Sequence, residues 1–105
     1  MRTPPLRKQI ETLLAYWRPI LGLDSWVIEV RWNEKHHTGW CIAKPKYREA
    51  MIGFNLARIK KECGRPEQVE DLVLHELLHA VVWKASETAV SQLTQAMLRA
   101  AGRRI

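Results

Sequence analysis

The feature that most constrains the fold is the segment 72–83, in which nine of twelve residues are apolar. The apolar side chains fall on every side of a helix, which predicts a helix buried at the centre of a domain. Its only ionisable residues are His75, Glu76 and His79. Buried without partners, three such groups would destabilise the fold, so we expect them to be hydrogen-bonded, to bind a metal or to face a cleft.

These three residues have the spacing His-Glu-x-x-His. Residues four apart share one helix face, with Cβ atoms about 5–6 Å apart, so both imidazoles can bind one zinc ion. Glu76 lies about 100° further round the helix, where it can reach a metal-bound water and act as its general base. The pattern predicts one zinc per chain, with Glu76 as the catalytic residue. The alternative is a pair of hydrogen-bonded core histidines.

A catalytic zinc site normally has three protein ligands and one open position. Beyond His79 the chain holds only one further candidate, Glu87, and no other Asp, His or Cys. A tight joint at residues 84–85 would fold the last helix back and bring its first turn near His79. Glu87 is therefore the predicted third ligand, the alternative being an ordinary acid that stabilises a helix N-terminus. Rival third ligands are His36, His37 and Cys63.

Hydrophobic periodicity predicts an α+β fold in one domain, residues 1–105. A helix over residues 4–18 should be ended by Pro19 and Gly22. Three strands follow, at residues 26–33, 40–44 and 50–56, and we expect a small antiparallel meander. Residues 56–63 suit a short helix or a basic loop. Two helices then complete the chain, one from Pro66 to about residue 83 and one from an N-cap at Ser86 to about residue 101.

Composition bounds the class of protein. The chain of 105 residues carries a formal net charge of +6 and two cysteines, Cys41 and Cys63, too few for a disulfide framework. No apolar run reaches the ~20 residues that a membrane span needs, and the basic N-terminus has no signal-peptide core. We therefore expect a cytoplasmic protein without a membrane partner. The basic residues gather in the stretches 2–8, 58–65 and 99–104, where solvated helix ends are the favoured interpretation and a nucleic-acid patch the less favoured one.

The HExxH motif at His75-Glu76-Leu77-Leu78-His79 resembles that of the zincins, a class of zinc metallopeptidases. The chain is most similar to short stand-alone metallopeptidases of phage and prophage type, which are gluzincin-like or SprT-like. This resemblance implies an antiparallel sheet with a substrate-aligning edge strand before the motif helix, and a further helix that supplies the third ligand, here Glu87. The extended metzincin motif is absent, because Val82 and Ala85 replace its glycine and histidine. For a phage-encoded protein, the compartment would be the host cytoplasm.

The leading hypothesis is thus a zinc-dependent peptidase, in which Glu76 deprotonates a zinc-activated water that attacks a peptide bond. A peptide or protein substrate would pair with an edge strand, for which residues 50–56 are the candidate. His36 and His37 could contact substrate or an oxyanion, although solvation is favoured, and Tyr47 could stabilise the tetrahedral intermediate, although packing is favoured. The alternative function is a non-catalytic basic protein that binds nucleic acid or a host protein, with a structural metal or a polar His-Glu-His cluster. The oligomeric state is left open.

Overall fold

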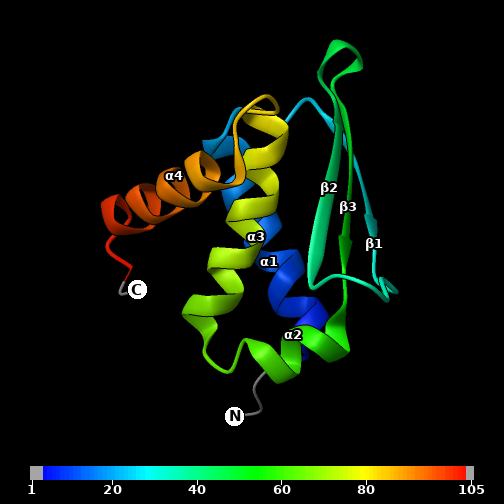
Figure 1. The fold of residues 1–105 in the computed structure, drawn as a ribbon, viewed down its shortest axis with the longest axis vertical. Coiled ribbons are helices and arrows are strands. Elements are labelled where there is room, and N and C mark those ends of the chain that lie inside the picture. Colours follow the sequence, from blue (N-terminus) through cyan, green and yellow to red (C-terminus); the bar gives the residue numbers. More distant parts are fainter. Residues whose placement is uncertain (1–3, 104–105) are drawn as a thin grey trace.

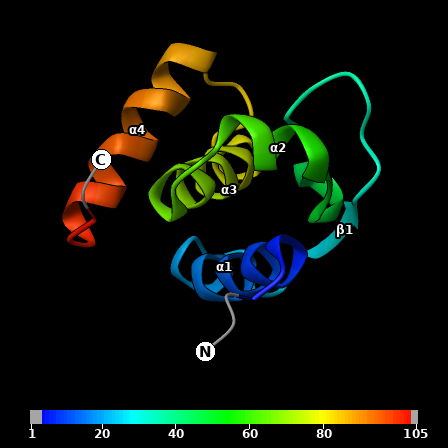
Figure 2. The same cartoon turned by 90° about the horizontal axis from the view of Figure 1, so that it is seen from below.

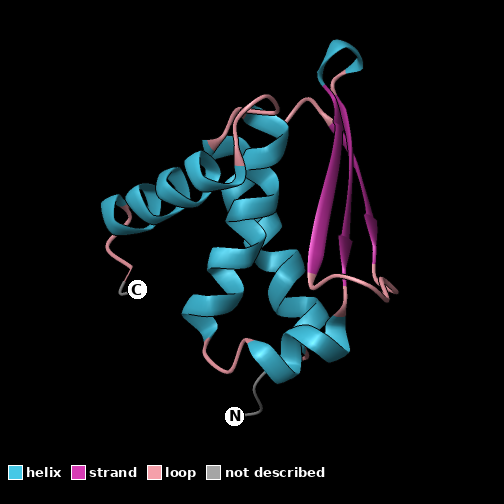
Figure 3. Cartoon of the chain, in the orientation of Figure 1, coloured by secondary structure: helices cyan, strands magenta, loops and turns pink. Residues whose placement is uncertain are grey.

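The computed structural model describes residues 4–103, so Arg2 and Arg104 of the basic stretches lie outside the described residues. The predicted α+β class is confirmed, with helices on one side and a three-stranded sheet on the other (Figure 3). The elements follow the order α1 (Leu6–Ile20), β1 (Val27–Arg31), β2 (Gly39–Lys44), the 3-10 turn η1 (Pro45–Tyr47), β3 (Glu49–Phe54), α2 (Leu56–Glu62), α3 (Pro66–Val81) and α4 (Glu87–Ala100).

The sheet is mixed, and the expectation of an antiparallel meander is wrong. Its strand order is β1-β3-β2, with β1 parallel and β2 antiparallel to β3. The connection from β1 to β2, residues 32–38, has to cross from one side of β3 to the other. The distance is ~10 Å, which seven residues can span because an extended residue covers about 3.3 Å. β3 takes the centre because residues 50–54 are all apolar or glycine, whereas no residue of β1 or β2 is fully buried.

Helix α3 lies at the centre of the molecule and contacts α1, α4 and β2 (Figure 1). Seen from below, α1 packs along one side of α3 while α4 lies on another (Figure 2). The side chains that form the core come from all these layers: Ile10, Leu14, Trp17, Leu23, Ile52, Phe54, Ile59, Val69, Val73, Leu74, Leu77, Leu78, Val90 and Leu98. The prediction that the motif helix is buried on most sides is therefore confirmed.

The end of the first helix differs from the sequence prediction. Helix α1 continues through Pro19 to Ile20, because a proline in the last turn removes only one backbone hydrogen bond. Gly22 then closes the C-terminus of the helix, as predicted: its φ of +73° allows the N–H groups of Gly22 and Leu23 to bond the carbonyls of Pro19 and Arg18.

The ambiguous segment after β3 forms helix α2. The side chain of Asn55 caps this helix by accepting the Arg58 backbone N–H at 3.0 Å.

Within residues 4–103, no helix has both the length and the apolar composition that a membrane span requires.

Candidate metal centre

His75 and His79 lie one above the other on the face of α3 that turns toward the start of α4. Their Nε2 atoms are 3.1 Å apart and their ring planes meet at 73°. The i, i+4 spacing alone brings the two rings together, since neighbouring turns of a helix stack side chains at this separation. Both imidazoles thus direct a ring nitrogen to the same point.

Glu87 reaches that point from α4. The Ser86 side chain caps α4 by accepting the Ala89 backbone N–H at 3.1 Å, which fixes Glu87 as the first residue of the helix. One carboxylate oxygen of Glu87 lies 3.0 Å from His75 Nε2 and the other lies 2.8 Å from His79 Nε2. The structure therefore brings His75, His79 and Glu87 together, as predicted.

This group could hold a metal ion. Its candidate ligand atoms all lie within 4.8 Å of one another. Zinc bonds of about 2.0–2.1 Å at tetrahedral angles separate neighbouring ligand atoms by about 3.3 Å, and the 3.1 Å between the two imidazole nitrogens is close to that separation. The Glu87 side chain is 76% exposed, which leaves the outer side of the group accessible to solvent.

Glu76 lies beside this group but is not part of it. The residue is only 5% exposed, and burial, together with the negative charge of Glu87, raises the pKa of its carboxyl to about 7. A cation bound by Glu87 would offset the effect of the Glu87 charge on the pKa of Glu76. A carboxyl with a pKa near neutrality can both accept and return a proton at physiological pH, as a general base must.

His75, His79 and Glu87 are called the metal-binding group below, since they could hold a metal ion. A cavity of about 320 Å³ joins Glu76 to this group, and its opposite wall is the start of β2, residues 39–41. Gly39 brings the β2 backbone close to the Glu76 carboxylate. A Cβ atom at Gly39 would lie 3.2 Å from Glu76 Oε2 and 3.4 Å from the Gly53 carbonyl oxygen. Sequence analysis missed this contribution of Gly39, because only the register of β2 against α3 reveals it.

The strand that borders the cavity is β2, not the predicted segment 50–56. That prediction is wrong because β3 is paired on both sides, whereas β2 has one free edge beside α3. The Asn55 N–H donates to the Thr38 carbonyl at 3.0 Å, in register with the β2–β3 pairing. Because such bonds alternate along an antiparallel pair, the backbone groups of Gly39, Cys41 and Ala43 point to the free edge.

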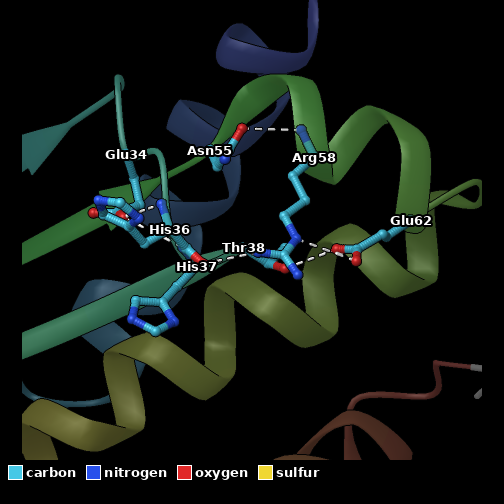
Figure 4. Close-up of polar contacts among 7 residues, drawn as sticks. All are labelled: Glu34, His36, His37, Thr38, Asn55, Arg58 and Glu62. Carbon is cyan, nitrogen blue, oxygen red and sulfur yellow. Dashed lines mark hydrogen bonds and ion pairs between the residues drawn. The ribbon is translucent and has the colours of Figure 1, made fainter.

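The loop before β2 carries His36 and His37, which are exposed and lie outside the metal-binding group. His37 lines the cavity beside Glu76. The loop is held by α2, since Arg58 donates to the His36 carbonyl at 2.8 Å and Thr38 donates to Glu62 at 2.8 Å (Figure 4). The pKa of the Glu62 carboxyl is lowered by the hydrogen bond from Thr38.

The remaining candidates lie apart from the metal-binding group. Tyr47 is in η1, is 64% exposed and lines neither of the two described cavities that border Glu76. Cys63 lines the larger of these cavities, about 600 Å³, which continues from His75 and Glu76 toward α2. Burial raises the pKa of its thiol, as it raises that of Cys41 to about 12, so neither sulfur is a ready thiolate ligand.

Comparison of the chain with protein-family models, curated proteins and solved structures finds no match.

The contribution of Glu87 can be tested by metal affinity. Glu87→Ala should weaken zinc binding by about a hundredfold, since it removes one of three protein ligands and even outer-shell changes cost ~10–100-fold. Titration against a competing chelator measures the effect. Glu67→Ala, an exposed acid on α3, is the control and should bind zinc as tightly as the wild type. Equal zinc affinity in both variants would show that Glu87 is not the third ligand.

Proposed function

We propose that this chain is a zinc-dependent peptidase. The observation that carries the proposal is the convergence of His75, His79 and Glu87 beside a buried carboxylate, Glu76, across a cavity from a free strand edge. A purely structural metal site needs the three ligands but has no use for Glu76 or for the strand edge. The combination favours chemistry on an extended chain.

His75 and His79 would bind zinc through Nε2, and Glu87 through its carboxylate, a set that suits this borderline-soft cation. Zinc so held supplies a Lewis acid that polarises a carbonyl and lowers the pKa of water. Glu76 accepts a proton from the attacking water and returns it to the amide nitrogen. A C–O bond forms as the C–N bond breaks, and the products are a carboxylate and an amine.

The substrate would pair with β2 by strand addition. The outward backbone groups of Gly39, Cys41 and Ala43 can accept an extended peptide, and antiparallel pairing is the more stable arrangement. A peptide in this position would border the cavity that Glu76 lines. The proposal places the chain among the zincins, of gluzincin-like or SprT-like type, acting on peptides or proteins in the cytoplasm.

Zinc binding and turnover are tested together. Purified protein should contain one zinc per chain by elemental analysis, and His75→Ala should lose it. Zinc removal should also lower the melting temperature, because a ligand of the native state adds stability by mass action. Zinc-loaded wild type should cleave an unfolded protein, as detected by mass spectrometry. Stoichiometric zinc without cleavage of any unfolded substrate would instead favour the non-catalytic binding protein.

A further inference from the structure

The larger cavity beside Glu76 carries an excess of negative charge. Asp71 and Glu76 of α3 line it, and Arg58 of α2 is its only lining Lys or Arg among the described residues. Arg58 is already engaged, since its Nε lies 3.3 Å from Glu62 and its Nη1 donates to the His36 carbonyl. The chain as a whole carries a net charge of +6, so a cavity lined mainly by acidic residues next to the metal-binding group is opposite in charge to the rest of the protein.

Asp71 is the acid in this cavity that the proposed reaction does not use. It lies four residues before His75, on the same face of α3, so that Asp71, His75 and His79 follow one another along that face. Its Oδ2 accepts the Gln95 side chain at 2.9 Å, which holds the carboxylate in place. Within residues 4–103, no donor is found for Oδ1.

The Asp71 charge acts inside the cavity. Burial is the main cause of the raised pKa of the Cys63 thiol, and the charges of Glu62 and Asp71 add to it. Cys63 and Asp71 both line this cavity. A cationic group that enters would meet a half-buried, pre-oriented carboxylate.

The direction of the substrate follows from the direction of β2. A peptide antiparallel to β2 runs from the Lys44 end toward Gly39, and Gly39 lines both cavities. The residue after the scissile bond therefore lies on the side of Glu76 that leads to Asp71. We propose that Asp71 selects a lysine or arginine side chain immediately after the scissile bond, an inference that rests on the proposed peptidase function.

The expected preference is large enough to measure. A hydrogen-bonded ion pair in a partly desolvated site changes specificity by about tenfold to a hundredfold. We expect kcat/KM to be higher by this factor for peptides with lysine at this position than for the same peptides with methionine. The corresponding glutamate peptides should be the poorest substrates, since two carboxylates would then face each other.

The experiment uses the zinc-loaded full chain. Cut sites in a denatured protein mixture are read by mass spectrometry, and matched peptides with Lys, Met or Glu after the cut site are then compared. Asp71→Asn, which keeps an acceptor for Gln95, should remove the preference for lysine while leaving the methionine peptide within about threefold. Asp71→Lys should shift the preference to glutamate. Glu67→Gln removes the same charge from an exposed position outside the cavity and should retain the wild-type preference.

Binding supplies a readout that does not depend on turnover. In the Glu76→Gln background, the lysine peptide should bind more tightly than the methionine peptide, and Asp71→Asn should equalise the two dissociation constants. Cleavage without a preference for basic residues, or a preference that survives Asp71→Asn, would overturn the inference but leave the peptidase proposal standing. Absence of any cleavage would instead refute the proposed function, and the inference with it.

Discussion

Replacement of Glu76 by glutamine should reduce peptide hydrolysis at least a hundredfold, since a positioned general base contributes about 10²–10⁴-fold. The amide matches the carboxylate in shape and can occupy the same space against Gly39, so the fold and the zinc content should be unchanged. It cannot accept a proton from water near neutral pH. The measurement is kcat/KM on a cleaved peptide, together with elemental analysis of the same preparation.

Glu76→Asp is the matched variant. It keeps the negative charge but withdraws the carboxylate by one methylene, so its activity should fall between those of the wild type and Glu76→Gln. A Glu76→Gln protein that retains zinc and cleaves at the wild-type rate would exclude Glu76 as the base. Loss of zinc in Glu76→Gln would instead show that Glu76 supports the metal site, and the loss of activity would then say nothing about proton transfer.

The metal-binding group could be predicted because its geometry is local. His75 and His79 are brought together by helix periodicity, and the short joint before Ser86 limits where Glu87 can lie. The three strands and α3 also lie within two residues of their predicted bounds, because each carries a clear apolar pattern, whereas residues 56–63 left a helix and a loop both open. Local sequence patterns therefore predict a contact well where the contacting residues are only a few positions apart.

The strand order could not be predicted in the same way. Three short strands can pair in several orders with the same buried faces, and the order is decided by which strand is apolar enough for the centre. The uninterrupted apolar run at residues 50–54 was the available signal, and it favours a central strand. The position of β2 at the edge that borders the cavity, and the close approach of Gly39 to Glu76, both follow from this strand order.

Glu70 is the clearest case of a residue whose environment depends on distant contacts. Helix α3 begins at Pro66, and Glu70 is buried beyond its first turn. Its two carboxylate oxygens accept Trp17 Nε1 at 2.8 Å and Arg103 Nε at 2.8 Å. Trp17 is 53 residues away and Arg103 is 33 residues away, so no local pattern connects them.

Glu70→Ala should destabilise the protein by about 3 kcal/mol, the upper end of the cost of leaving a buried hydrogen-bond donor, here the Trp17 N–H, without its acceptor. The Trp17 N–H would lose its acceptor inside the core, and Arg103 would lose its anion, so the C-terminal segment would detach from α1 and α3. For a domain of this size the melting temperature should fall by roughly 12–24 °C, measured by circular dichroism on zinc-free protein. Glu70→Gln keeps an acceptor for Trp17 but removes the charge that faces Arg103, so its loss of stability should be smaller.

The control is Glu67→Ala, which lies exposed one turn earlier on α3 and should stay within about 0.5 kcal/mol of the wild type. If the melting temperatures of Glu70→Ala and Glu67→Ala were equal, the hydrogen bonds that Glu70 accepts from Trp17 and Arg103 would not stabilise the fold.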